Sequence, residues 1–253
     1  MEHFFIRLAG IAIGVHCQYY STKEYCSEYL TDTEPLFSVS VSETEIEAEQ
    51  RFFAEKRSPA YLETLALYRK IAEGLLDYDV LLLHGSAIAV DGEVYIFIAP
   101  SGTGKSTHTA LWRTLLKPPE HEVCMVNDDK PLIRVTREQI LACGTPWTGA
   151  HRLGENVMLP VKAICILERA KQNTIEEITA DQAFSFLFRQ TYHPDNAEQL
   201  ARVLCLLGEI KSRVRFYCLR CTVSEEAVKT AYNRMKSGET NEAKERNVDA
   251  FHG

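Results

Sequence analysis

The 253-residue sequence predicts an α/β (α+β) protein: a mixed β-sheet core over residues 78–238, preceded by a small β-rich part with a helix over residues 1–77. Two observations predict the core. An apolar run at Glu93–Ile98 leads through a glycine-bearing loop into a helical stretch at 105–116, and a further apolar run follows at 121–126. The dipeptide Asp91-Gly92 separates two apolar runs, which is a strong hairpin signal and predicts an antiparallel strand in this sheet.

Composition limits the classes of function. Hydrophobic residues make up 45% of the chain and charged residues 25%, as in ordinary globular proteins. The formal net charge of −7 argues against nucleic acid as a partner, and no apolar run is long enough to span a membrane. The eight cysteines are scattered, several of them in apolar runs, which predicts reduced thiols and a cytoplasmic location.

Residues 1–57 are expected to be mostly β. The apolar segment 4–15 is interrupted by Arg7 and indicates strands rather than a signal peptide, and 36–42 alternates as a half-buried strand does. The acidic stretch 43–49 is expected to be a solvated loop or strand edge. Ser58-Pro59 predicts a helix start, and an apolar stripe at helical spacing continues to about residue 75 and is expected to pack in the core.

The Asp91-Gly92 hairpin has a predictable register. Counting back from the turn pairs Ser86 with Phe97 and His84 with Ala99, so the hairpin would carry His84 to the mouth of the glycine-bearing loop. A histidine there could serve chemistry, or could be a core residue bonded to a backbone carbonyl. Both interpretations remain open at this point.

The loop from Ala99 to Thr107 has the residues of a phosphate-binding loop. Its two glycines allow the backbone N–H groups to approach a polyphosphate, and the following helix presents its N-terminus to the anion. Lys105 can reach the outer phosphates, and the Ser106 hydroxyl suits Mg²⁺. A plain Gly/Ser turn is the alternative, and the first glycine of the usual pattern is Ala99. The predicted nucleotide-binding residues are Ser101, Gly102, Thr103, Gly104, Lys105, Ser106 and Thr107.

Two carboxylates follow the next strand. The run 121–126 is expected to lie parallel to the strand before the loop, so its carboxyl end brings Asp128 and Asp129 beside the phosphate site. One carboxylate could then hold Mg²⁺ and the other accept a proton. The alternative is an ordinary turn, because Asn-Asp-Asp before Lys-Pro is good turn chemistry.

The remaining chain continues the α/β pattern. A breaker-rich loop at 144–152 precedes a buried strand at 161–168, helices are expected at 179–190 and 194–209, and a strand at 213–221. A last helix at 224–237 has Ser224 as its cap and Gly238 as its end. The polar tail 239–253 is expected to be disordered. Cys218 and Cys221 would point to opposite faces of a strand, which argues against a metal or redox pair.

His84-Gly85, the loop 101–106 and the pair Asp128-Asp129 together resemble the HPr serine kinase/phosphorylase C-terminal-domain family, whose nucleotide core is similar to that of phosphoenolpyruvate carboxykinase. The resemblance covers residues 78–170 and extends to Leu111-Trp112 and to the stretches 127–131 and 144–147. It implies a mixed-sheet P-loop kinase core.

The resemblance also implies a function: an ATP- and Mg²⁺-dependent kinase that phosphorylates a Ser or Thr hydroxyl of a small protein or peptide. Lys105 and the loop backbone would hold the phosphates, and Ser106 with Asp129 would hold Mg²⁺. Asp128 would accept the hydroxyl proton and His84 would orient that carboxylate, although the sequence does not fix which aspartate has which role. Related enzymes are often oligomeric, which makes a homo-oligomer possible.

The chain departs from the family at two places. Thr107-His108 stands where the bifunctional enzymes carry an acidic residue, and the 144–152 loop replaces their phosphorylase segment. Phosphorolysis and HPr as the acceptor are therefore not predicted. His151 and Arg152 could contact phosphate or substrate, or be a solvated pair. The alternative functions are a small-metabolite kinase and a nucleotide-binding regulatory protein without transfer activity.

Overall fold

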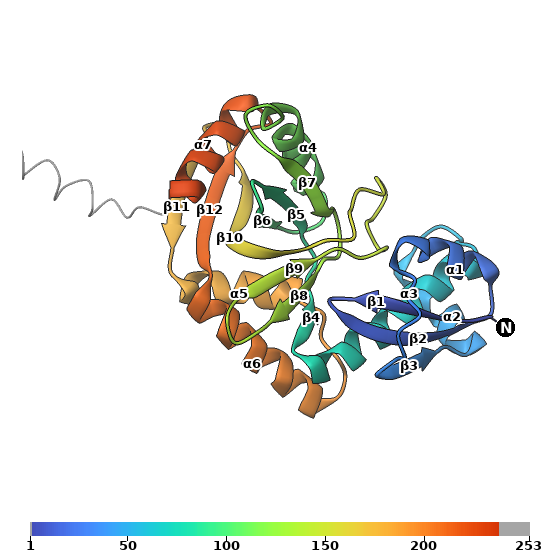
Figure 1. Cartoon of the computed structure of the whole chain (residues 1–253). Helices are drawn as coiled ribbons and strands as arrows, with labels where there is room; N and C mark the ends of the chain where they lie inside the picture. The colour runs from blue at the N-terminus through green and yellow to red at the C-terminus, as the bar shows by residue number, and fades with distance from the viewer. Residues whose placement is uncertain (1, 238–253) are drawn as a thin grey trace, which may run out of the picture.

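Residues 2–237 are described by a computed structural model, which is an α/β fold with a curled, mixed β-sheet (Figure 1). The strands of this sheet, in chain order, are β4 (Val80–Leu82), β5 (Ser86–Val90), β6 (Glu93–Ile98), β7 (Val123–Asn127), β8 (Leu132–Val135), β9 (Ile140–Cys143), β10 (Met158–Arg169), β11 (Thr174–Ile178) and β12 (Arg215–Cys221). The predicted α/β class with a mixed sheet is confirmed.

The long strand β10 joins two arms of the sheet. Its residues 158–160 pair with β9, which continues through β8 to β4. Its later residues pair in parallel with β6 on one side and β12 on the other. Beyond β6 come β5 and then β7, both through antiparallel pairing. Strand β7 therefore runs in the direction of β6, as predicted, but β5 lies between them.

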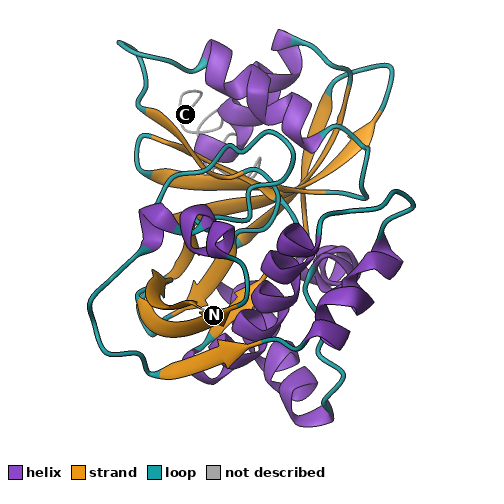
Figure 2. Ribbon diagram, turned by 90° about the vertical axis from the view of Figure 1, so that its right-hand side faces the viewer, coloured by secondary structure: helices purple, strands orange, loops and turns teal. Residues whose placement is uncertain are grey.

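Two helical layers cover the opposite faces of this sheet (Figure 2). Residues of α4 (Lys105–Leu115) and α7 (Glu225–Ser237) pack on one face, and residues of α5 (Ala180–Gln190) and α6 (Ala197–Arg213) pack on the other. Successive side chains of β6 point to opposite faces of the sheet. Tyr95 and Phe97 face α4, while Ile96 and Ile98 face the α5 side. Covering on both faces explains why these strands are continuously apolar.

The predicted elements of the C-terminal half are confirmed. Thr179 and Asn196 cap α5 and α6, and the Ser224 hydroxyl accepts a bond from the Ala227 N–H at the start of α7. Cys218 and Cys221 are both buried on β12. No helix within residues 2–237 is long and apolar enough to cross a bilayer. The predicted end at Gly238 and the tail 239–253 lie outside the described residues.

The N-terminal part has its own three-stranded sheet and is not mostly β. Strands β1 (Glu2–Leu8) and β2 (Ile11–Cys17) form a hairpin about Ala9-Gly10, and β3 (Phe37–Ser40) adds in parallel. Helices α1 (Tyr20–Tyr25), α2 (Glu43–Glu49) and α3 (Pro59–Leu75), together with three-residue 3₁₀ turns and loops, make up the remainder. The stretch 43–49, expected to be a loop or strand edge, is thus a helix.

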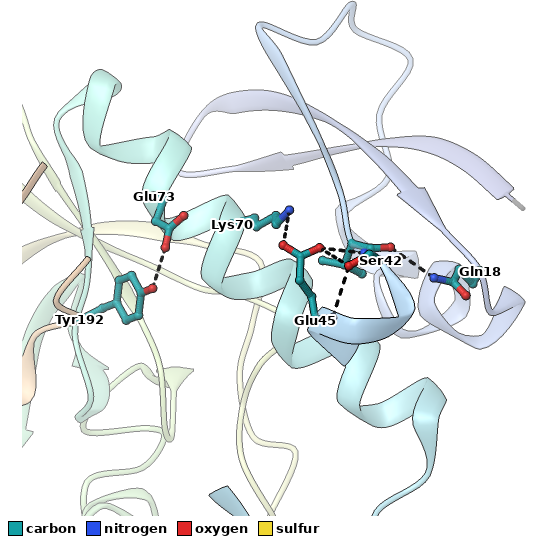
Figure 3. A network of polar contacts seen from close by, with 7 residues as sticks. Gln18, Ser42, Glu45, Lys70, Glu73 and Tyr192 are labelled. Atoms are coloured by element: carbon teal, nitrogen blue, oxygen red, sulfur yellow. Dashed lines mark hydrogen bonds and ion pairs between the residues drawn. The ribbon is translucent and has the colours of Figure 1, made fainter. Parts of the chain in front are cut away.

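A capping box explains why residues 43–49 form a helix. The Ser42 hydroxyl accepts a bond from the Glu45 N–H, and the Glu45 carboxylate accepts one from the Ser42 N–H. Lys70 of α3 lies 2.7 Å from the same carboxylate (Figure 3). This lysine and the Ser42 N–H together lower the pKa of Glu45 to about 2.

Helix α3 (Pro59–Leu75) connects the N-terminal sheet to the core. Ser58 caps it and Pro59 is its first residue, as predicted. Its apolar stripe packs against both β2 and residues of β4, β8 and β9. The Tyr192 hydroxyl donates to Glu73 at the end of α3, over 2.7 Å, and ties the helix to the segment after α5 (Figure 3).

His108 of α4 is a core residue. Only 4% of it is exposed, it stacks edge-on against Phe97, and its Nε2 accepts a 2.9 Å bond from Trp112 Nε1. Burial lowers the pKa of the imidazole from 6.5 to about 4. The side chain is therefore neutral at pH 7.

The variant His108→Gln should make the protein less sensitive to acid. Between pH 6.5 and about 4 the unfolded chain binds a proton at His108 that the folded chain does not, so stability falls as the pH falls through this window. From pH 7 to pH 5 this group costs about 2 kcal/mol. Glutamine keeps an acceptor for Trp112 but removes the titration. Urea unfolding at the two pH values measures the difference, and equal acid sensitivity in both proteins would refute the assignment.

Candidate active site

The glycine-bearing loop lies between β6 and the N-terminus of α4. Gly102 and Gly104 have φ of +77° and +117°, a region that glycine enters without strain. A Cβ added at either glycine would meet no atom within 4 Å, so the loop presents open backbone on that side. Ala99, the buried residue directly after β6, has no positive φ, which explains why this position needs no glycine.

Lys105 begins α4 and is buried under the loop. Its Nζ donates to the Ala99 carbonyl over 2.8 Å, across the base of the loop. Burial lowers the pKa of Lys105, while the negative charges of Asp129 and Asp128 raise it. Ser106 and Thr103 are partly exposed, and Ser101, Gly102 and Thr107 are exposed. The predicted phosphate-binding residues therefore form one continuous segment, the loop and the start of α4, beside Asp128 and Asp129.

Arg169 at the end of β10 fixes the loop from the neighbouring strand. Its Nε donates to the Thr103 carbonyl at 2.9 Å and its Nη2 to the Gly102 carbonyl at 2.5 Å. These bonds hold both carbonyls turned toward the arginine and so fix the backbone of the loop at Gly102 and Thr103. The sequence gives no local signal for this contact, because the partners are 66 residues apart.

Asn127 organises the carboxylate turn. It ends β7 and is fully buried. Its Oδ1 accepts bonds from the Asp129 and Lys130 N–H groups at 2.9 and 2.7 Å, and its Nδ2 donates to Thr145 and to the Trp147 carbonyl. One side chain therefore shapes the Asp128-Asp129 turn and holds the 144–152 loop against it.

Asp128 points toward α4 and is 5% exposed. Ser86 Oγ of β5 donates to its Oδ1 over 2.6 Å, and Thr109 Oγ1 of α4 lies 3.4 Å from the same atom. Ser86 and Thr109 were not predicted as site residues. The sequence offers a weak indication of each, since Ser86 is a polar residue in an apolar strand and Thr109 lies one helical turn after Lys105.

His84 contacts Asp129 rather than Asp128. Its Nε2 lies 3.5 Å from Asp129 Oδ1, and the next N–H, of Gly85, donates to the Asp129 carbonyl. The register is confirmed as far as Ser86–Phe97, but the expected pair of His84 with Ala99 does not form. The His84 N–H donates instead to the Gln190 carbonyl at the end of α5.

His84 is neutral at pH 7. Burial and then the charge of Lys105 lower its pKa, and these outweigh the opposing charge of Asp129. The contact between His84 and Asp129 is therefore a polar contact between an imidazole and a carboxylate rather than an ion pair.

Two hollows adjoin these residues. One, of about 480 Å³, lies between the loop at 100–103, the end of β10 and Phe186. The other, of about 260 Å³, is lined by Asp129 and Lys130, by the 147–152 loop, and by α1 and α3 of the N-terminal part. We call the second hollow the acceptor cavity. Asp129 is the carboxylate that opens into it.

The residues fit a nucleotide with one divalent cation better than a cation alone. Among residues 2–237 no three His, Cys, Asp or Glu side chains converge as a metal site. Mg²⁺ in nucleotide sites takes one or two carboxylates or hydroxyls and completes its shell with phosphates and water. Ser106, Asp128 and Asp129 supply such a set, next to an open backbone loop. No family model matches the chain, and a search of the curated proteins finds no match either.

The variant Gly149→Ala should disturb the carboxylate turn. Gly149 has φ +72°, and an added Cβ would lie 2.8 Å from the Asp129 Cβ. Strain and contact together should lower the free energy of unfolding by about 1–2 kcal/mol. Gly208 is the matched control, because an added Cβ on this exposed α6 glycine meets nothing within 4 Å. Gly208→Ala should be neutral or stabilise by up to about 1 kcal/mol. Denaturant unfolding compares the two, and equal stability would contradict the packing described.

Proposed function

We propose that the protein is an ATP- and Mg²⁺-dependent kinase that transfers the γ-phosphate to a hydroxyl group. The observation that carries the proposal is the position of two carboxylates, one buried and one open to a cavity, beside a glycine-bearing loop that has a lysine at its base. This combination suits phosphoryl transfer, in which positioning and charge stabilisation supply most of the catalysis. It also agrees with the resemblance to the HPr kinase family.

The loop and Lys105 would hold the triphosphate. The open backbone at Gly102 and Gly104 gives N–H donors to the phosphate oxygens, and the N-terminus of α4 adds its dipole. Lys105 would exchange the Ala99 carbonyl for a phosphate oxygen. The hollow beside Phe186 and the end of β10 would take the nucleoside.

The surroundings of the two aspartates favour an exchange of the roles expected from the sequence. Asp129 opens to the acceptor cavity and contacts His84, so it suits the acceptance of a proton from the attacking hydroxyl. Asp128 is bound by Ser86 and faces α4, so with Ser106 it suits the metal. Mg²⁺ bound there would neutralise charge on the transferring phosphoryl group. Neutral His84 would orient the Asp129 carboxylate.

The acceptor is proposed to be a Ser or Thr hydroxyl of a small protein or peptide, with a small metabolite as the second candidate. The size of the acceptor cavity, about 260 Å³, is the observation that supports the second candidate. The structure gives no ground for phosphorolysis.

Replacing Lys105 with Ala should weaken nucleotide binding. Loss of the buried ammonium removes a charge-assisted contact to the phosphates, so the affinity for a non-hydrolysable Mg²⁺·ATP analogue should fall at least about 10-fold by calorimetry. Lys117→Ala, an exposed lysine just beyond α4, is the control and should bind as the wild type does. Equal affinity in all three proteins would remove the basis for nucleotide binding.

The aspartate assignment predicts different defects for two variants. Asp129→Asn should lower transfer from labelled ATP to acceptors in a cell extract about 10²–10⁴-fold and leave the affinity for nucleotide unchanged, because only the proton acceptor is lost. Asp128→Asn should instead weaken the Mg²⁺-dependent part of nucleotide binding. Asp181→Asn, at an exposed acid of α5, is the control. Full transfer by Asp129→Asn would disprove the role of this carboxylate.

A further inference from the structure

The acceptor cavity carries an excess of positive charge. Lys130 and Arg152 line it together with a single acid, Asp129. Among the described residues neither cationic side chain has a hydrogen-bond or ion-pair partner. Two cationic side chains of α3, by contrast, have acidic partners: Arg69 pairs with Glu49 and Lys70 pairs with Glu45. Two cations against one acid leave a net positive charge in this partly enclosed hollow, which creates a potential that attracts an anion.

Arg152 is also held in an uncommon backbone conformation. Its φ is +52°, in the left-handed region that residues other than glycine rarely adopt. The chain turns back there, with the Arg152 N–H 3.4 Å from the Gly149 carbonyl, and Gly149 itself packs on Asp129. Strained residues of this kind concentrate at binding sites, where the surrounding structure maintains them.

The walls of the cavity are rigid and partly aromatic. Trp147 donates to the Thr64 carbonyl of α3 and stacks on Tyr68 with the rings 4.0 Å apart. Tyr25 of α1 and Tyr61 of α3 complete this wall. The N-terminal part therefore builds half of the cavity that the proton acceptor faces.

We propose that the kinase acts on an acceptor that carries an anionic group, such as a carboxylate, close to its hydroxyl. This inference rests on the proposed function, because it specifies the acceptor of that site. Lys130 and Arg152 bind the anion, which places the hydroxyl at Asp129. The cavity of about 260 Å³ suits a group the size of one amino acid, either a free hydroxy acid or a serine beside an acidic side chain in a peptide.

The transfer step follows from this placement. The acceptor hydroxyl oxygen forms a bond to the γ-phosphorus, and the bond between the γ-phosphorus and the β–γ bridging oxygen breaks, so that ADP leaves. The hydroxyl proton passes to the Asp129 carboxylate. Neutralisation of the acceptor's own charge by two cations reduces its repulsion from the triphosphate.

Calorimetry with charge-matched probes tests the inference without requiring turnover. Three pairs are titrated into the protein, with and without the Mg²⁺·ATP analogue: D-glycerate and glycerol, N-acetyl-L-serine and its amide, and the capped peptides acetyl-Ala-Ser-Glu-amide and acetyl-Ala-Ser-Gln-amide. In at least one pair the anion should bind at least 10-fold more tightly than its neutral partner. The pair that responds distinguishes a free acid from a peptide.

Arg152→Gln and Lys130→Gln should each reduce the preference for the anion at least 5-fold and leave the affinity for the ATP analogue unchanged. Arg137→Gln, in an exposed turn away from the cavity, should keep the full preference. The inference is overturned if no pair shows a preference, if Arg152→Gln preserves it, or if Arg152→Gln weakens the ATP analogue instead. A preference for the anion in a protein that binds no ATP analogue would defeat the proposed function but not the anionic cavity.

Discussion

The carboxamide of Asn127 is the interaction on which the candidate site depends. Its oxygen fixes the two N–H groups that shape the Asp128-Asp129 turn, and its nitrogen fixes the 144–152 loop. As a consequence Asp128 turns toward α4 and Asp129 toward the acceptor cavity, although the two are adjacent in sequence. Buried amides of this kind are effective only when both ends are bonded, because an unpaired polar group in the core costs about 1–3 kcal/mol.

Strand β5 lies between β6 and β7, and it therefore brings further polar side chains to the two aspartates. Ser86 of β5 reaches Asp128, which follows the neighbouring strand β7, and the chain just before β5 brings His84 to Asp129. Helix α3 of the N-terminal part approaches the same turn from another direction. Its Thr64 carbonyl accepts a bond from Trp147 of the 144–152 loop, and its Tyr68 hydroxyl donates to the Lys130 carbonyl. Three segments far apart in the chain thus converge on four consecutive residues, 127–130.

The sequence predicted the features that depend on neighbours in the chain. The Asp91-Gly92 turn, the Ser58-Pro59 helix start and the loop at 99–107 all lie where expected, because each is set by local backbone preferences. The capping box of Ser42 and Glu45 was an equally local signal, but the acidic composition of 43–49 concealed it. His84 was expected near the site, but its partners were predicted wrongly, because its N–H donates to Gln190 instead of pairing with Ala99. The contacts of Arg169 could not be predicted, because it meets its partners only in the folded sheet.

The position of β10 has a consequence for the order of folding. The hairpin of β5 and β6 can form early, since its strands adjoin, but β6 pairs with its parallel neighbour only when residues 67–68 positions later in the chain have closed a long chain loop. Arg169, at the far end of that strand, can bond to Gly102 and Thr103 only once β10 is in place. A nascent chain that ends before β10 would therefore contain the residues of the glycine-bearing loop without the two bonds that fix its carbonyls.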